Sequence, residues 1–172
     1  MKPLESSPRP IDAGVRIGHV HLKTADIQRI YDFYVGILGF DVVFRLEHAL
    51  FVSAGGYHHT LGFNTWESKG GTPPPPGTTG LYHVAILYPT RATLGDALRR
   101  LMDAGYPLDG VNDHGTHEAL YLTDPDGNGL ELCWDRPESE WPVDKEGHLT
   151  FGGGELDIAG LLAEGDALRK EK

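Results

Sequence analysis

Three residues of this 172-residue chain have side chains and positions that could bind one metal ion. His19 and His83 each lie inside a strand-like run and are each followed by valine. Glu131 is the one charged residue in the apolar run 130–134. A carboxylate there is costly to bury unless it is paired, protonated or bound to a metal. Two imidazoles and one carboxylate form the facial triad that suits non-haem Fe(II). We therefore predict a metal site made by His19, His83 and Glu131, with Fe(II) as the expected metal and Mn(II) as the alternative.

These residues lie in two copies of one pattern. Residues 15–66 have the order strand, amphipathic helix and three strands, and residues 81–136 repeat this order. His19 and His83 fall at the same place in the first strand of each copy. Each residue alone also has a simpler interpretation, as a core or surface histidine or as a carboxylate paired with a basic side chain. The repeat favours the metal, because both copies place a histidine at one position.

The repeat predicts an α+β fold of two tandem βαβββ units, related by a pseudo-twofold axis and forming a cup-shaped mixed sheet. Helices are expected at 27–38 and from about 90 to 104, each preceded by a capping residue and ended by glycine. The expected strands are 15–23, 40–46, 49–54, 57–66, 81–87, 106–111, 119–123 and 129–134.

Three segments lie outside the two units. Residues 1–14 contain prolines and no periodicity, which predicts a flexible arm. Residues 67–80 contain four consecutive prolines and are expected to be a stiff, extended linker. Residues 137–172 are polar and glycine-rich, with one apolar patch, and are expected to form a docked turn or short helix with a frayed, charged end. The predicted single domain is residues 15–136.

Composition excludes several classes of partner. A net charge of −10 argues against nucleic acid and anionic membranes, which both require basic patches. The sequence has no long apolar run and no signal-peptide pattern, so we expect no membrane association. The single cysteine, Cys133, is expected to be a packing residue, and its lack of a partner cysteine fits a reducing cytoplasm.

The turn before Glu131 is the densest local signal in the chain. Residues 124–129 read Asp-Pro-Asp-Gly-Asn-Gly, a combination that is typical of tight turns. Strand-like runs flank this turn on both sides, which predicts a hairpin. Tyr121 lies on its first strand and Glu131 on its second.

With these motifs in place, the chain resembles the vicinal oxygen chelate superfamily, which includes glyoxalase I, bleomycin-resistance proteins and extradiol dioxygenases. The resemblance covers about residues 15–136 and implies the cup-shaped fold. It implies less about the reaction, because the superfamily hosts several chemistries. The motifs that carry it are Gly18–Leu22 leading to Asp26, Phe33–Tyr34, Leu38–Phe40, Tyr82–Ala85, Asp124–Asn128 and Glu131–Leu132.

Gly62 distinguishes among the branches of this superfamily. Glyoxalase I is similar in layout but has a fourth ligand, an acid at the position that aligns with Gly62, and glycine has no side chain to ligate a metal. The segment 58–63 is similar to the His-His-x-Leu-Ala-Phe segment of extradiol dioxygenases, whose second histidine is the acid/base catalyst. The equivalent residue is His59. Tyr121 matches an active-site tyrosine, and His114 resembles a further active-site histidine.

The choice between His114 and His117 stays open, because the spacing from His114 to Tyr121 is shorter than in the large two-domain enzymes. His117, His48 and His148 have no motif to support a role. We expect these three to be surface residues.

The resemblance implies an Fe(II)-dependent extradiol dioxygenase of catechol 2,3-dioxygenase type, acting on a small aromatic diol with O2. His59 would then transfer a proton, and Tyr121 and His114 would bind the substrate oxygen. A homodimer is expected, as for superfamily members with one pair of units. Two alternatives stay open: a glyoxalase-type, metal-dependent isomerase or lyase, and a non-catalytic drug-binding protein of bleomycin-resistance type.

Overall fold

The structure is a computed structural model that describes residues 9–150 and 152–170. In the first unit the elements are β1 (Val20–Lys23), α1 (Ile27–Tyr31), the π-helical η1 (Asp32–Ile37), β2 (Asp41–Arg45), β3 (Ala49–Ser53) and β4 (Leu61–Asn64). In the second unit they are β5 (Val84–Leu87), α2 (Arg91–Asp103), β6 (Gly110–Asp113), β7 (His117–Thr123) and β8 (Gly129–Asp135). The short 3-10 helix η2 (Glu138–Glu140) and α3 (Ile158–Lys170) follow.

The two units have the same sheet topology. The first sheet has the order β1-β4-β3-β2 and the second the order β5-β8-β7-β6. In each sheet the first strand of the unit runs parallel to the last, and the other neighbours are antiparallel. The predicted α+β fold of two βαβββ units is therefore confirmed.

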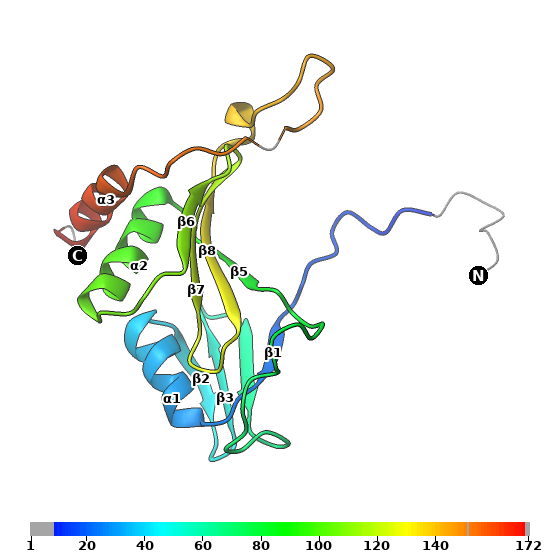
Figure 1. Cartoon of the computed structure of the whole chain (residues 1–172), viewed down its shortest axis with the longest axis vertical. Coiled ribbons are helices and arrows are strands. Elements are labelled where there is room, and N and C mark those ends of the chain that lie inside the picture. Colours follow the sequence, from blue (N-terminus) through cyan, green and yellow to red (C-terminus); the bar gives the residue numbers. More distant parts are fainter. Residues whose placement is uncertain (1–8, 151, 171–172) are drawn as a thin grey trace.

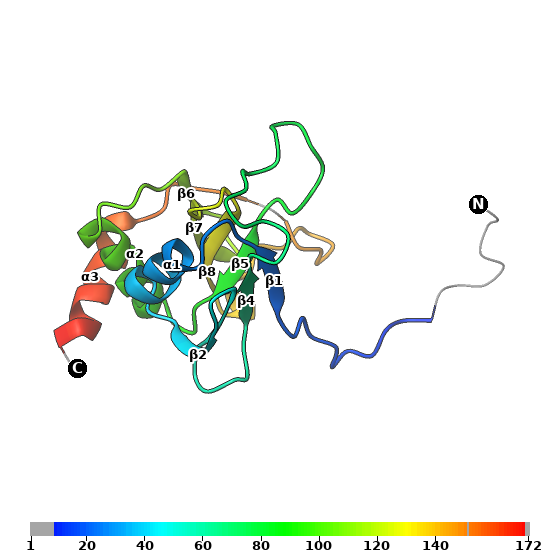
Figure 2. The same ribbon diagram turned by 90° about the horizontal axis from the view of Figure 1, so that it is seen from below.

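The helices lie on one side of the strands and leave the other side without a helix (Figures 1 and 2). A single apolar core fills the space between helices and strands, and residues of both units contribute to it. Its largest fully buried side chains include Tyr34, Phe33 and Phe63 from the first unit and Leu94 and Leu132 from the second.

Local sequence explains where the helices begin and end. The Asp26 carboxylate accepts hydrogen bonds from the first backbone N–H groups of α1, and Thr90 forms a capping box with Thr93 at the start of α2. Gly39 and Gly105 follow the two helical segments at φ values of 84° and 64°, which glycine adopts without steric cost. The predicted helix 27–38 is present, but its second half is π-helical.

Four predicted strands begin several residues later than expected. Residues 15–19, 57–60, 81–83 and 106–109 do not belong to strands, so the predictions for those residues were wrong. A strand requires a hydrogen-bonded neighbour, and the parallel ladders begin only at Val20 and Val84. His19 and His83 therefore each lie one residue before a strand, at equivalent places.

The C-terminal segment forms a third helix that packs on the second. Gly95 of α2 and Gly165 of α3 face one another so closely that a Cβ on Gly95 would lie 2.1 Å from the carbonyl oxygen of Leu161. Ion pairs from Arg169 to Asp96 and Asp103 continue this contact towards the end of the helix. The predicted docked helix is confirmed, but the expected frayed end is wrong as far as Lys170.

The ends of the chain limit two expectations. Residues 1–8 of the predicted arm and residues 171–172 of the predicted tail lie outside the described residues. Residues 9–14 are exposed and contain no helix or strand. None of the helices in the described ranges is long and apolar enough to cross a bilayer.

Candidate active site

Glu131 lies at the centre of the candidate site. It occupies β8 between Ala85 of β5 and Tyr121 of β7, and its side chain is only 8% exposed. Its Oε2 atom lies 3.0 Å from His83 Nε2. Its Oε1 atom accepts a hydrogen bond from the Tyr121 hydroxyl at 3.0 Å and lies 3.1 Å from His117 Nε2. The buried carboxylate is therefore surrounded by imidazoles and a phenol, rather than by lysine or arginine.

Tyr121 connects Glu131 to His114. Its hydroxyl oxygen lies 2.8 Å from His114 Nε2, and the rings of His114 and His117 stack with centroids 4.5 Å apart. Burial, and then the hydrogen bond to Glu131, raise the pKa of Tyr121 to about 12. The phenol therefore stays protonated at neutral pH and remains a hydrogen-bond donor.

An ion-pair network holds the turn that carries the two histidines. Arg136 Nη2 lies 2.7 Å from Asp113 Oδ2 and 2.8 Å from Glu118 Oε1. Arg91 of α2 pairs with the other oxygen of Glu118, which is buried. Asp113 also accepts a hydrogen bond from the backbone of Gly115. Charged hydrogen bonds therefore fix both ends of the segment that carries His114 and His117.

The hairpin before Glu131 is anchored to the first unit. Asp124 accepts hydrogen bonds from the backbone of Asp126 and Asn128, and from the Tyr34 hydroxyl at 3.1 Å. Asp126 in turn pairs with Arg29 of α1. Burial raises the pKa of the Asp124 carboxyl. These contacts hold the turn before β8 against α1 and η1 of the first unit.

His19 and His59 lie together in the first unit. Their rings have centroids 4.4 Å apart, and His59 Nδ1 lies 2.8 Å from His58 Nδ1. Desolvation, and then the neighbouring His19 and His58, lower the pKa of His59. A lowered pKa favours the neutral imidazole, which is the form that can accept a proton.

The structure thus brings together some of the predicted residues. His83, Tyr121 and His114 gather around Glu131, whereas His19 stands beside His59. Within residues 9–150 and 152–170, the one group of three with ligand atoms within 4.8 Å of one another is His114, His117 and Glu131. The predicted trio of His19, His83 and Glu131 is not such a group, and its role as the metal site stays a prediction.

The donors around Glu131 fit a divalent metal ion. Each carboxylate oxygen has an imidazole nitrogen within 3.1 Å. A carboxylate and imidazoles suit Fe(II) and other first-row metals, and a metal stabilises a buried carboxylate.

A comparison with known families agrees with the fold. The family model described as "Glyoxalase/Bleomycin resistance protein/Dioxygenase superfamily" matches residues 16–132. The chain belongs to this superfamily. This superfamily contains both enzymes and binding proteins, so membership alone does not define the reaction of this chain.

Curated relatives from this superfamily are dioxygenases by name. A catechol-2,3-dioxygenase of Bacillus subtilis (strain 168) is 39% identical over 160 residues, which are 93% of this chain and 55% of that protein. Biphenyl-2,3-diol 1,2-dioxygenase 3 of Rhodococcus globerulus is 32% identical over 117 residues, which are 68% of this chain and 62% of that protein. The chain therefore spans little more than half the length of these relatives.

Solved structures of the superfamily share the fold. A glyoxalase/dioxygenase from Nostoc punctiforme has a TM-score of 0.61 at 19% identity, covering 77% of this chain and 100% of that one. A lactoylglutathione lyase from Agrobacterium tumefaciens has a TM-score of 0.55 at 19% identity, covering 73% and 96%. At such low identity the likeness supports the architecture and not the reaction.

Gly62 occupies the position in the first unit that corresponds to Glu131 in the second. In the parallel ladders His21 pairs with Gly62, as Ala85 pairs with Glu131, which confirms the alignment of the two units. A Cβ on Gly62 would lie 3.0 Å from His21 Nδ1, so an imidazole covers the place of the missing side chain. His21 Nε2 lies 2.8 Å from the amide nitrogen of Asn64. The first unit therefore has no carboxylate at this position.

His117, the open alternative to His114, lies on Glu131 itself. It was expected at the surface, but its Nε2 atom lies 3.1 Å from Glu131 Oε1 and its side chain is only 26% exposed. The predicted strand began at Ala119, whereas β7 begins at His117. Extending the alternation by two residues places His117 on the face of Tyr121, so the signal was present. His48 and His148 are exposed, as expected.

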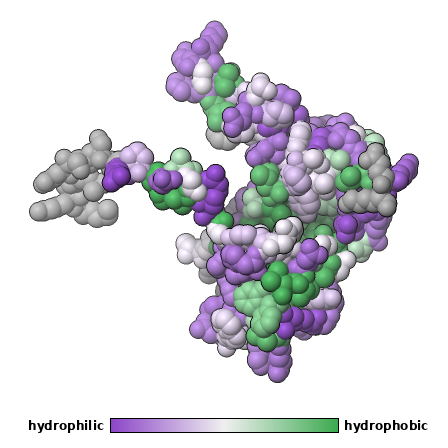
Figure 3. Space-filling view, turned by 180° about the vertical axis from the view of Figure 1, so that it is seen from behind, coloured by the Kyte–Doolittle hydropathy of each residue, from purple (hydrophilic) through white to green (hydrophobic). Residues whose placement is uncertain are grey.

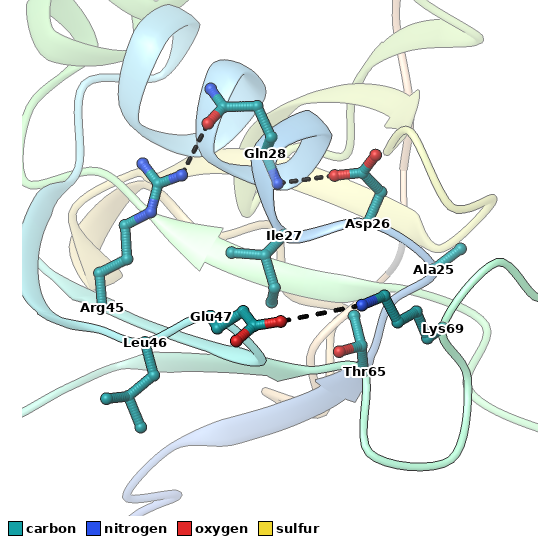
Figure 4. Close-up of a pocket in the computed structure, with 9 residues that line it drawn as sticks. All are labelled: Ala25, Asp26, Ile27, Gln28, Arg45, Leu46, Glu47, Thr65 and Lys69. Carbon is teal, nitrogen blue, oxygen red and sulfur yellow. Dashed lines mark hydrogen bonds and ion pairs between the residues drawn. The ribbon is translucent and has the colours of Figure 1, made fainter.

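A separate pocket lies beside the start of α1. It has a volume of about 650 Å³ and is lined by Asp26, Gln28, Arg45, Glu47 and Lys69, among others (Figure 4). Its polar groups contact one another: Arg45 bonds to the Gln28 oxygen at 2.6 Å, and Lys69 lies 4.0 Å from Glu47. None of the predicted site residues lines this pocket.

Proposed function

We propose that this chain is an Fe(II)-dependent extradiol dioxygenase that opens the ring of a catechol-like aromatic diol with O2. The named dioxygenase relatives support this class of reaction. The observation that carries the proposal is the buried Glu131 carboxylate, which has an imidazole at each oxygen. Its counterpart in the first unit is Gly62, so the site would have one anionic ligand.

His19, His83 and Glu131 would hold the metal in this proposal. When bound, Fe(II) would bring the diol and O2 together and let electron density pass from one to the other. The remaining steps depend on the side chains around it, which orient the diol and move its protons. Their arrangement supplies the proximity that reactants free in solution lack.

His59 would accept a proton from a diol hydroxyl and return it later in the reaction. It stands beside the proposed ligand His19, and its environment favours the neutral imidazole. The Tyr121 hydroxyl has one proton, which it donates to Glu131 in the absence of substrate, and this O–H would turn to a substrate oxygen when the diol binds. His114, which contacts the Tyr121 hydroxyl, would support that donor.

The test uses the full chain purified without oxygen and loaded with one equivalent of Fe(II). We expect it to consume O2 and form a yellow ring-opened product with catechol or 2,3-dihydroxybiphenyl. His59→Ala should lose at least tenfold in turnover while it keeps its iron, because the residue would move a proton and bind no metal. His148→Ala, at an exposed histidine, is the matched control and should behave as the unmodified chain.

Other results would assign the chain to another class. Stoichiometric iron without O2 consumption, over a panel of aromatic diols, would overturn the dioxygenase proposal. Thiol-adduct isomerisation with nickel or zinc would favour the glyoxalase-type alternative. Tight binding of an aromatic drug without bound metal would favour the bleomycin-resistance type. Elemental analysis of the purified chain separates these results at the first step.

A further inference from the structure

Among the described residues, His83, His117 and Tyr121 lie within hydrogen-bond distance of Glu131. The proposed mechanism has no use for His117. Its Nε2 atom lies 3.1 Å from Glu131 Oε1, and its Nδ1 atom lies 2.9 Å from the Thr116 hydroxyl. Both ring nitrogens therefore have partners, and the partners differ in what they can do. An ionised carboxylate only accepts hydrogen bonds, whereas a hydroxyl can donate or accept.

These partners select one tautomer of His117. Nε2 must carry the proton in order to donate to Glu131, and Nδ1 of the neutral ring must then accept from Thr116. The ring is also held on its face, by stacking on His114 with centroids 4.5 Å apart. Backbone bonds hold the segment at both ends: the His114 N–H donates to the His117 carbonyl, and the Arg136 N–H to the Thr116 carbonyl.

The contact acts on one oxygen of Glu131. Oε1 accepts hydrogen bonds from His117 Nε2 and from the Tyr121 hydroxyl, whereas Oε2 lies 3.0 Å from His83 Nε2. Two donors on Oε1 restrict rotation of the carboxylate and leave Oε2 as the oxygen turned towards the proposed ligand His83. Partners of this kind orient a metal ligand and raise the affinity for the ion.

We propose that His117, fixed by Thr116, is a positioning residue that holds Glu131 with Oε2 directed at the metal. The inference rests on the proposed function only in taking Glu131 as a metal ligand. It assigns a role to a residue that the superfamily motifs of this chain left without one. The competing assignment makes His117 itself a ligand, together with His114 and Glu131.

The experiment measures Co(II) binding to the full chain by competition with a chromophoric chelator, without substrate. His117→Phe keeps a flat ring but removes the donor, and should weaken Co(II) affinity on the order of 10–100-fold while one ion still binds per chain. Thr116→Val should also weaken Co(II) affinity, but by a smaller factor. It removes the hydroxyl that fixes the tautomer of His117 and leaves the imidazole in place. His117→Gln can still donate, and should restore most of the affinity and the Co(II) absorption spectrum.

Two matched controls separate positioning from general damage. Thr116→Ser keeps the hydroxyl and should bind like the unmodified chain. His148→Phe alters a histidine that is 77% exposed and should change nothing. Circular dichroism melting of each variant shows whether it is folded, and His117→Gln and Thr116→Val still decide the question if His117→Phe does not fold.

Each remaining outcome overturns a defined statement. Unchanged Co(II) affinity in folded His117→Phe overturns the positioning role and leaves the proposed function standing. Loss of stoichiometric binding in His117→Gln also overturns it, in favour of His117 as a ligand. If His117→Phe weakens Co(II) binding but the Fe(II)-loaded unmodified chain opens no diol, the positioning role stands and the proposed function is overturned. An unmodified chain that binds no Co(II) overturns both.

Discussion

The two βαβββ units share a topology but differ at the position that matters for chemistry. His19 and His83 stand at equivalent places, one residue before β1 and β5. Gly62 and Glu131 are a second pair of equivalent positions. In the first unit the His21 imidazole covers Gly62, and in the second Glu131 is buried. Because the two units share their ladders, backbone geometry alone would not make the proposed metal site. The donor atoms of one side chain decide which unit can provide the anion.

The units also differ in how they are covered. α2 runs for 13 residues and carries α3 on its outer side, whereas the first unit has five α-helical residues followed by η1. β2 is exposed along its whole length, and Phe44 is 56% exposed. From behind, apolar side chains gather in the lower half of the molecule, where the strands of the first unit lie (Figure 3). The first unit thus presents apolar surface, and the second buries a polar network.

The largest expected effect tests the difference between Gly62 and Glu131. Glu131→Gln keeps the size of the side chain but removes the anion, so metal affinity should fall by a factor on the order of 100 or more. Metal content after dialysis, with circular dichroism as the folding check, measures this loss. Retention of one ion per chain would show that Glu131 is not a ligand.

The reverse substitution probes the first unit. In Gly62→Glu the new Cβ would lie 3.0 Å from His21 Nδ1, so the imidazole must move. We expect a loss of about 1–3 kcal/mol in the free energy of unfolding, as is usual for overpacked positions. The paired variant Gly62→Glu with His21→Ala relieves the contact and should recover part of that loss in urea unfolding.

A third prediction concerns the helix that covers the second unit. In Gly165→Val the side chain would meet the backbone of Gly95, which lies 2.4 Å from an ideal Cβ. Because backbone cannot yield as a flexible side chain does, α3 should be displaced, at a cost of about 1–3 kcal/mol. Urea unfolding measures it. Ala167→Val, at an exposed position of the same helix, should cost much less, and equal losses would contradict the close-packing explanation.

Alternation and turn chemistry in the sequence were enough to predict the repeat. They placed Glu131 in the last strand, and the ladder register of the structure then aligned Gly62 with it. The strand ends were not predictable, because a strand begins where its ladder partner begins, and that partner is distant in sequence. The surface position predicted for His117 was wrong for this reason. The alternation was read from Ala119, two residues too late.

Contacts between segments were harder to predict than the segments themselves. The apolar patch of the C-terminal region indicated a docked element, but the close approach of α3 to α2 requires two glycines that face one another. Similarly, equivalent positions in a repeat favoured His19 and His83 as joint ligands. In the structure His83 contacts Glu131, and His19 contacts His59. Sequence symmetry predicts equivalent places, whereas distances depend on how the units pack.

The smallest expected effect is a pH dependence confined to the α2–α3 contact. Burial acts to raise the pKa of Asp96, but hydrogen bonds from Arg100 and Arg169 outweigh it, and the pKa is lowered. The folded state thus binds this proton less readily than the unfolded state, so the pair stabilises the fold above the ordinary aspartate pKa of about 4. This contribution is lost as the pH falls through the lowered value.

Urea unfolding between pH 7 and pH 3 measures the contribution of Asp96. As the pH falls over this range, the free energy of unfolding should decrease less for Asp96→Asn than for the unmodified chain. The two decreases should differ by under about 1 kcal/mol, because Arg169 is partly exposed and water screens the pair. Glu146→Gln removes an exposed carboxylate from the loop before α3 and should follow the unmodified chain. If Asp96→Asn shows the same pH dependence as the unmodified chain, the ion pair contributes nothing to stability. The packing of α3 on α2 then depends on the Gly95–Gly165 contact and not on the ion pair.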